Sequence, residues 1–280
     1  MGIERVSTIL KMADEANTSV IAFNCLDYST VKCVITAAEE LNKPVICMLY
    51  PNDANLYHWT EPAVFAATVR ALARDVKVPV GLHLDHCSDY AYIVAAIRDG
   101  FQSVMYDGSA LPLEENIANT REIVKVARVL GADVEAELGQ VGFADDVTDQ
   151  SNIDMYTKPE VAKAFCEETG CDAVAVSIGS AHGFYKETPR LDMERLKAIN
   201  AATDVPLVLH GGSGIPDDQL EVAFREGINK FNVGTEFFWL YYETVKQQAA
   251  KEGSSIHGLP SAIQEKLSEY LRKKMQLCKM

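Results

Sequence analysis

Short apolar runs alternate with longer amphipathic stretches along almost the whole chain. The apolar runs are rich in β-branched residues, which is typical of parallel strands covered on both faces. Eight runs are predicted as strands, at residues 20–23, 44–49, 80–84, 103–106, 133–138, 173–178, 206–209 and 230–233. Helical spacing covers residues 30–41, 62–75, 89–98, 113–130, 159–169, 193–202 and 217–226. This alternation predicts an α/β fold, a (β/α)8 TIM barrel forming a single domain over residues 1–280.

Three segments fall outside the repeat. Helical patterns occupy residues 6–16 and 260–275. The second is an extra C-terminal helix with apolar residues at helical spacing, and it can close the barrel base or contact a partner subunit. Residues 139–157 are long, acidic and irregular, which is typical of a mobile active-site lid.

Three histidines follow apolar runs closely, and the barrel prediction makes them the main candidates for chemistry. They are His86, His182 and His210. In a barrel of this kind, polar residues at the carboxyl ends of the strands converge on one site. Three imidazoles in such a position favour zinc or a similar metal over magnesium. The sequence therefore predicts a metal site at this end of the barrel.

The segment around Asp85 and His86 carries a geometric condition. A regular strand would point these two neighbours to opposite faces. Both reach one site only if the chain has left regular strand geometry by Leu84 or Asp85. His83 is then expected to be a residue of the barrel interior or a support for the site.

Carboxylates mark two neighbouring strand ends. Asp107 follows one predicted strand, and Glu137 lies near the end of the next, with Glu135 on the same side. A carboxylate inside a barrel is costly unless it is paired, protonated or bound to a metal. Two interpretations of these carboxylates remain: a second metal position, or structural carboxylates held by hydrogen bonds.

Glycine-rich segments follow the last two predicted strands. Residues 211–214 read Gly-Gly-Ser-Gly, and residues 232–235 read Asn-Val-Gly-Thr. The loops after strands seven and eight form the recurrent phosphate site of this fold. Glycines let backbone N–H groups approach an anion, and the Ser and Thr hydroxyls add donors. A phosphate site beside the metal site is expected.

Composition limits the classes of binding partner and the cellular compartment that we expect. The net charge of −14 argues against nucleic acid or an anionic membrane as a partner. The seven cysteines form no CxxC pair, which favours reduced thiols in a cytoplasmic protein. We find neither a signal peptide nor an apolar segment long enough to span a bilayer.

At these motifs the chain resembles the class II, metal-dependent fructose- and tagatose-bisphosphate aldolases. The resemblance runs over essentially the whole chain. Its most specific pieces are Leu-Asp-His at 84–86, Met-Tyr-Asp-Gly-Ser at 105–109, Glu-Ala-Glu-Leu-Gly at 135–139, Ala-His-Gly at 181–183 and Leu-His-Gly-Gly-Ser-Gly at 209–214. Their shared order along the chain makes a chance match hard to obtain.

The resemblance implies roles for individual residues. The catalytic zinc would be held by His86, His182 and His210, and a second metal position by Asp107 and Glu137. Asp85 matches the aspartate that transfers the C4 hydroxyl proton. The residues matching the sites for dihydroxyacetone phosphate or its sugar are Asn24, Gly183, Gly211, Gly212, Ser213, Asn232, Val233, Gly234 and Thr235.

The implied reaction is the reversible retro-aldol cleavage of a phosphorylated ketose, a carbohydrate-metabolism lyase reaction of the glycolytic type. Zinc acts as the Lewis acid for the ketone oxygen, an enediolate forms as the C3–C4 bond breaks, and no lysine Schiff base is needed. An acid on the loop after Glu137 protonates the carbon, and Asp145 aligns with it, one methylene shorter than the family's glutamate. A monovalent cation at the phosphate site is left open.

Other departures concern the far end of the sugar. Gly234 stands where fructose-bisphosphate enzymes carry an aspartate, and Phe238 where a basic residue commonly grips the distal phosphate. Tyr50 replaces a small residue near the substrate. An aromatic ring cannot substitute for a cation. The substrate is thus a ketose 1-phosphate or 1,6-bisphosphate of the fructose or tagatose type, or a 1-phosphate with a deoxy or modified far end.

Two rival functions have less support. A metal-dependent hydrolase on this barrel usually has His-x-His at the end of strand one, where this chain has Phe23, Asn24 and Cys25. A non-catalytic sugar-phosphate-binding protein would be expected to lose the metal ligands or Asp85, and all are present. The family resemblance further implies a homodimer or homotetramer.

Overall fold

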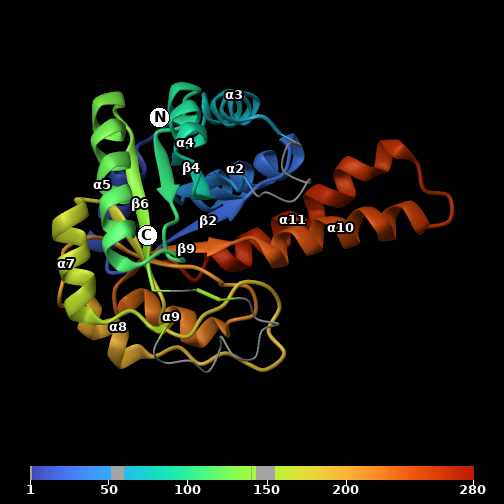
Figure 1. Ribbon diagram of the computed structural model, residues 1–280. Coiled ribbons are helices and arrows are strands. Elements are labelled where there is room, and N and C mark those ends of the chain that lie inside the picture. The colour runs from blue at the N-terminus through green and yellow to red at the C-terminus, as the bar shows by residue number, and fades with distance from the viewer. Residues whose placement is uncertain (1, 52–59, 140, 143–154) are drawn as a thin grey trace.

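The computed structural model describes residues 2–51, 60–139, 141–142 and 155–280. Across these residues, eight parallel strands pair side by side and close through the pairing of β4 with β5, with helices around the outside (Figure 1). The barrel strands are β2 (Val20–Asn24), β3 (Val45–Leu49), β4 (Pro79–Cys87), β5 (Ser103–Tyr106), β6 (Asp133–Leu138), β7 (Ala173–Val176), β8 (Leu207–Leu209) and β9 (Ile228–Val233). The predicted (β/α)8 barrel is confirmed.

A helix follows each barrel strand, and the first seven were predicted. The helices, in chain order, are α2 (Tyr28–Leu41), α3 (Pro62–Ala73), α4 (Tyr90–Arg98), α5 (Leu113–Leu130), α7 (Pro159–Thr169), α8 (Met193–Asn200), α9 (Asp217–Arg225) and α10 (Thr235–Ala250). The first begins with a capping box, in which Asp27 accepts from the N–H of Thr30 and the Thr30 hydroxyl oxygen accepts from the N–H of Asp27. A cap of this kind is worth about 1 kcal/mol.

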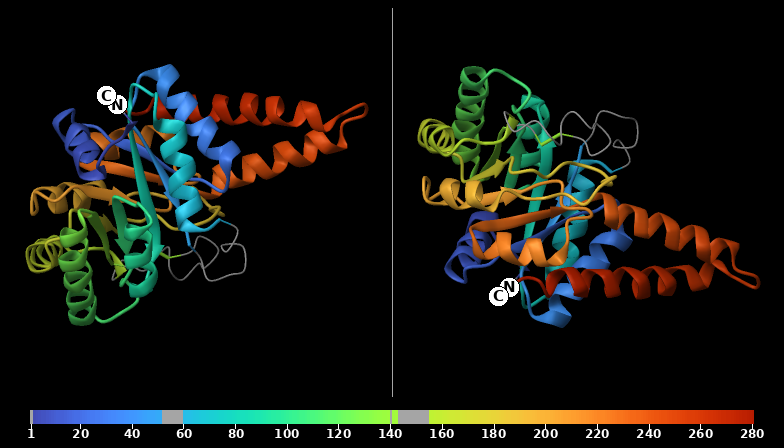
Figure 2. Two further views of the ribbon diagram at one scale, coloured as in Figure 1. Left: turned by 90° about the horizontal axis from the view of Figure 1, so that it is seen from above. Right: turned by 90° about the horizontal axis from the view of Figure 1, so that it is seen from below.

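The sequence did not predict α10. Its first turns carry the aromatic run Phe237, Phe238 and Trp239, residue types that are enriched in strands and obscure helical spacing. After a short 3-10 turn, Ile256–Gly258, the chain returns as α11 (Leu259–Met275). The two helices form an antiparallel hairpin that projects from the barrel, and α11 packs on α10 and α2 (Figures 1 and 2).

Side chains of the strands divide between two faces. The outward residues, such as Phe23, Leu84 and Phe231, form the main core beneath the helices. Inside the barrel, a smaller apolar cluster includes Ala22 and Ile46. A Cβ added at Gly81 would meet Val6 and Ile9 of α1 (Val6–Glu15) at 3.0 and 3.3 Å, so this helix closes the amino end of the barrel. The short strand β1 (Gly2–Ile3) pairs beside it with the start of β4.

The barrel interior changes from apolar to polar toward the carboxyl ends of the strands. Above the apolar cluster, the same inward positions carry buried polar or charged residues: Asn24, His83, Asp85, Glu135, Glu137, His210, Lys230 and Asn232. Buried polar groups need partners. This end of the barrel is therefore where a site is expected.

Candidate active site

Strand β4 is irregular where it enters the site. Its register with β5 shifts between Leu84 and Cys87, and His86 adopts a left-handed backbone with φ of 42°. That conformation is uncommon for a residue with a Cβ and concentrates at functional sites. The irregularity meets the condition set by the sequence, because Asp85 and His86 both reach the site. His83 lies in the barrel interior as predicted, 2.7 Å from the Ser103 hydroxyl through Nδ1.

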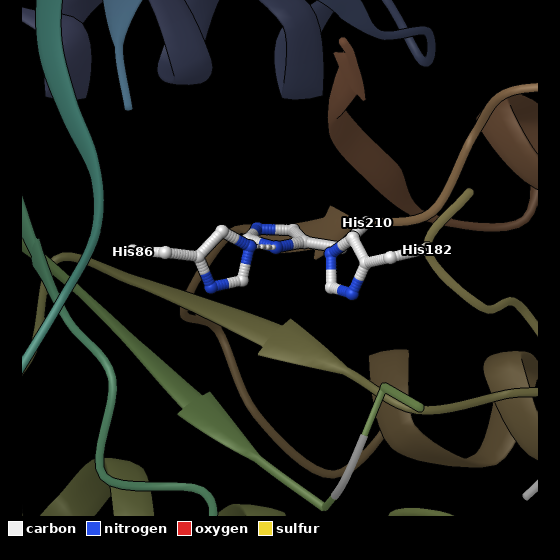
Figure 3. Close-up of side chains that lie close together, drawn as sticks. All are labelled: His86, His182 and His210. Atoms are coloured by element: carbon white, nitrogen blue, oxygen red, sulfur yellow. Dashed lines mark hydrogen bonds between the residues drawn. The ribbon is translucent and has the colours of Figure 1, made fainter. Parts of the chain in front are cut away.

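The three predicted histidine ligands come together from β4 and from the loops after β7 and β8. Figure 3 shows their rings converging, with His210 Nδ1 2.7 Å from His86 Nε2. Ring centroids lie 4.9 Å apart for His86 and His182 and 6.0 Å apart for His182 and His210. Among the described residues, donor atoms of this triad all lie within 4.8 Å of one another.

Each imidazole is held through its other ring nitrogen. His86 Nδ1 lies 2.9 Å from Asp107 Oδ2, His182 Nδ1 lies 3.2 Å from the carbonyl of Val141, and His210 Nε2 lies 2.9 Å from Glu135 Oε1. Acceptors at these positions place the proton on the outward nitrogen. The inward nitrogen is then oriented toward a metal, which is the usual arrangement around metal-bound histidines.

A second set of donors overlaps the first. His86, Asp107 and Glu137 also have donor atoms within 4.8 Å of one another. The Glu137 Oε2 atom is buried and has no hydrogen-bond partner within the described part of the chain. Such an orphaned carboxylate oxygen beside three imidazoles fits a metal site.

Charges at the site are strongly coupled. Burial lowers the pKa of His86, but the Asp85 charge and the hydrogen bond with Asp107 outweigh it and raise that pKa to about 10. Burial and the Asp107 charge raise the pKa of Glu137 to about 8. Burial and the His86 charge lower the pKa of His182 to about 4 and that of His210 well below its usual value. Without a metal, these shifts favour protons on His86 and Glu137 near neutral pH.

Zinc binding should therefore release protons. A ligating imidazole must be neutral, so the metal displaces the proton of His86, and a second proton leaves if Glu137 joins the ligands. Apparent affinity for zinc should rise between pH 6 and 8, about tenfold per unit for each proton released. Calorimetry in buffers of different ionisation enthalpy measures this release. Zinc binding without proton release would mean that His86 is already neutral.

Asp85 is clamped by two amides. Asn24 Nδ2 donates to its Oδ2 atom at 2.8 Å, and Asn232 Nδ2 donates to its Oδ1 atom at 3.0 Å. The carboxylate is 2% exposed and lies on the same strand as His86. The buried Asn24 Oδ1 has no hydrogen-bond partner in the described residues. These contacts fix the carboxylate in place and leave a polar acceptor beside it.

Most of the predicted phosphate-binding residues lie on the loop after β8 and where β9 leads into α10. A Cβ at Gly211 would lie 2.4 Å from the Ala181 carbonyl oxygen, and one at Gly212 would lie 2.2 Å from the Phe231 ring, so only glycine fits. Gly234 is the N-cap of α10, and as a glycine it has no side chain to cap the helix. The N–H groups of the first turn of a helix suit an anion.

The other predicted residues of this region differ in which of their atoms can contact a ligand. Ser213 is buried, and its hydroxyl oxygen accepts from the N–H of Glu236. Thr235 is the first residue of α10, and Gly183 directly follows His182. The Val233 side chain packs in the core, so only its backbone can serve a ligand.

Two predictions fall on parts of the chain that are not described. Asp145 lies outside the described residues, as does most of the predicted lid at residues 139–157. Tyr50 and Phe238, singled out for the far end of the sugar, are described. The Tyr50 ring meets the His86 ring edge-on at 5.9 Å, and Phe238 packs against the core.

Sequence reasoning missed two contributors. The Tyr185 hydroxyl donates to the carbonyl of Gly211 at 2.7 Å and accepts from the N–H of Ala181 at 2.6 Å, joining the loops after β7 and β8. Lys230 lies inside the barrel beneath the site. Its position two residues before Asn232 was the signal, because alternate residues of a strand share a face.

Comparison with known proteins agrees with this geometry. A family model described as fructose-bisphosphate aldolase class-II matches residues 4–280. A sulfofructosephosphate aldolase from Alkalicoccus urumqiensis is 37% identical over 251 residues, which cover 89% of this chain and 86% of the relative.

Two solved structures share the fold over nearly their whole length. The YdjI aldolase from Escherichia coli K12 is 33% identical, with a TM-score of 0.87, and the match covers 98% of this chain and 97% of that one. A putative fructose-1,6-biphosphate aldolase from Coccidioides immitis is 29% identical, with a TM-score of 0.86, covering 98% and 95%. The chain belongs to the class II fructose-bisphosphate aldolase family.

Proposed function

We propose that this protein is a zinc-dependent aldolase that cleaves a ketose 1-phosphate to dihydroxyacetone phosphate and an aldehyde. One observation carries the proposal: Asp85, held between two amides, lies on the strand that supplies His86 to a three-imidazole cluster. The family supports an aldolase, and the imidazole donors favour zinc. The His86, His182 and His210 rings would hold the ion, with Asp107 and Glu137 offering a second position.

In this mechanism the chain's own groups move the protons. Bound zinc supplies a Lewis acid that polarises the ketone oxygen of the substrate. Asp85 accepts the proton of the C4 hydroxyl as the C3–C4 bond breaks, and the electrons of that bond pass to C3. The aldehyde leaves, and an acid protonates C3 to give dihydroxyacetone phosphate; Asp145 is our candidate for that acid. Asn24 and Asn232 keep the Asp85 carboxylate aimed at the hydroxyl.

The C1 phosphate would be bound by backbone N–H groups rather than by a cluster of cations. The loop after β8 begins with His210, a Cβ added at Gly234 would lie 3.3 Å from Asn24 Nδ2, and the chain's net charge is −14. Backbone N–H groups of a loop and of a helix N-terminus can bind an anion locally in such a protein. Whether K⁺ or Na⁺ assists would be read from the cation dependence of KM.

Replacing Tyr185 by phenylalanine tests the phosphate loop. The change removes the hydroxyl that joins Gly211 to the loop of His182; of its two hydrogen bonds, the one to the Gly211 carbonyl holds the phosphate loop, and its loss costs about 1 kcal/mol net. KM for the phosphorylated substrate should rise by about fivefold, since 1 kcal/mol corresponds to this factor, while kcat stays near wild type. Zinc content is the control. An unchanged KM would contradict a role for this loop in phosphate binding.

We further propose that the far end of the sugar carries no phosphate. Phe238 occupies the position of the family's distal base and cannot pair with a phosphate. The Alkalicoccus relative is named for a sulfonated fructose phosphate. A modified far end, sulfonate included, therefore fits better than a bisphosphate.

A substrate panel tests both proposals. Release of dihydroxyacetone phosphate would be followed from fructose and tagatose 1-phosphates, their 1,6-bisphosphates and sulfofructose 1-phosphate. We expect EDTA to abolish release and zinc to restore it, and a 1-phosphate without a second phosphate to give the highest kcat/KM. If kcat/KM were higher for the bisphosphates by orders of magnitude, only the proposal about the far end of the sugar would be overturned. Zinc binding without cleavage of any member would favour the sugar-phosphate-binding alternative.

We also propose a cytoplasmic homodimer or homotetramer. The hairpin of α10 and α11 projects from the barrel (Figure 2). Its Trp239 and Tyr242 side chains are large and exposed, with ring centroids 5.7 Å apart, which is typical of interaction surfaces. All seven cysteines are buried thiols, as in proteins of reducing compartments. Light scattering coupled to gel filtration gives the number of subunits. Among the described helices, none is both long and apolar enough to cross a membrane.

A further inference from the structure

Lys230 is a fully buried lysine inside the barrel, directly beneath the candidate active site. Its exposed fraction is 0%, and it lies on β9 two residues before Asn232, on the same face of the strand. The Nζ atom lies 2.8 Å from Glu135 Oε2 and donates to Asn232 Oδ1 at 2.8 Å. One cation thus touches two residues that each support a different part of the site.

The first of these contacts leads to the metal cluster. The Glu135 carboxylate lies between the ammonium group and His210, with its Oε1 atom 2.9 Å from His210 Nε2. A carboxylate only accepts, so it places the proton of His210 on Nε2 and turns Nδ1 toward His86. The ion pair with Lys230 fixes the carboxylate that sets this orientation.

The second contact leads to Asp85. An asparagine amide can be flipped so that its oxygen and nitrogen exchange places. The flipped amide of Asn232 would aim its NH₂ group at the ammonium of Lys230, where two donors would face each other. The lysine therefore selects the orientation in which Asn232 Nδ2 donates to Asp85 Oδ1 at 3.0 Å.

Stability alone is a weak reason for this arrangement. Burying two ions is expensive, and a well-packed apolar pair of similar volume is often at least as stable. The lower interior of the same barrel is filled in that apolar way, by residues such as Ala22, Ile46 and Met48. A charged pair at the level just beneath the site is better explained by what it orients.

We propose that Lys230 is a positioning residue that orients the metal ligand His210 through Glu135 and the proton acceptor Asp85 through Asn232. The Asp85 half rests on the proposed aldolase function, whereas the metal half does not need a substrate. Each half predicts a separate measurable loss when the lysine is removed.

The test compares two variants with a matched control. Lys230→Met removes the cation and leaves Glu135 charged, while the double change Glu135→Gln with Lys230→Met leaves the pair neutral. Lys43→Met is the control, because Lys43 precedes β3 at the opposite end of the barrel and donates to the carbonyl oxygens of Cys278 and Met280, away from the site. Zinc affinity by chelator competition, thermal midpoint, kcat and KM would be measured for each.

We expect Lys230→Met to weaken zinc binding by about 10- to 100-fold, the usual effect of removing support from a metal ligand. Its kcat should fall by about 100-fold at saturating zinc, with KM changed far less, since Asp85 loses its fixed partner. The double variant should regain the thermal midpoint but neither zinc affinity nor kcat. Lys43→Met should match wild type in both.

Recovery of zinc affinity and kcat together with the thermal midpoint in the double variant would overturn the proposal, because charge neutrality would then be the whole role. Failure of both variants to fold would make Lys230 a folding residue and would overturn it too. If wild type cleaves no ketose phosphate, the proposed function fails, yet zinc affinities of the variants still decide the metal half.

Discussion

Replacing Asp85 by asparagine should lower kcat for cleavage by about a thousandfold, a typical loss for removing a positioned general base. The carboxylate is the group that would accept the C4 hydroxyl proton, and it is oriented by donors from Asn24 and Asn232. An amide at this position cannot accept the proton, and its NH₂ group would face one of those donors. Steady-state kinetics on the best substrate of the panel measures the loss.

A partial reaction separates this role from a general disruption of the site. Exchange of a C3 proton of dihydroxyacetone phosphate with solvent needs the metal and the carbon acid but no C4 hydroxyl. The Asp85→Asn variant should keep this exchange, followed by NMR in D₂O, within about tenfold of wild type, because it keeps its zinc. Loss of exchange in step with cleavage, at full zinc occupancy, would show that Asp85 acts on the carbon or only holds the site together.

The barrel could be read from the sequence because its signal is repeated. Each strand is a short apolar run buried on both faces, and the structure has all eight in the predicted order. The failure at α10 has a local cause, since Phe237, Phe238 and Trp239 belong to residue types that favour strands. Packing against α11 and the core decides that segment, and neither is visible in its own sequence.

The residues of the site that lie in the strand-end motifs could be predicted from the sequence. The histidines, Asp85 and the glycines occupy fixed places at strand ends, so the topology alone brings them together. The residues that support these motifs were harder to predict, because the partners of Glu135 and Tyr185 come from other elements of the barrel. Lys230 shares a strand face with Asn232, but only the fold shows that it also meets Glu135.

The left-handed backbone at His86 is a place where the regular alternation of side chains along a strand is broken. A strand that kept its regular pleat would send Asp85 and His86 to opposite sides, and one of them would be lost to the core. The bulge between Leu84 and Cys87 instead places the proton acceptor and a metal ligand next to each other. Sequence reasoning could state the need for this irregularity but not its form.

Two variants would decide which donors hold zinc. If the histidine triad binds the ion, His210→Gln should weaken zinc binding by about a thousandfold or more, and cleavage should fall to background, because a ligand is lost. Asp107→Asn should cost about 10- to 100-fold in affinity, since it only replaces the charged acceptor that orients His86 by a neutral amide. Chelator competition and metal analysis give both values, with circular dichroism as the check on folding.

The order of these two losses separates the overlapping donor sets. If His86, Asp107 and Glu137 formed the primary site, Asp107→Asn would remove a ligand and would be the more damaging change. His210 would then matter only through its 2.7 Å contact with His86. Because Asp107, the Val141 carbonyl and Glu135 each turn one of the three rings inward, we expect the loss at His210 to be the larger.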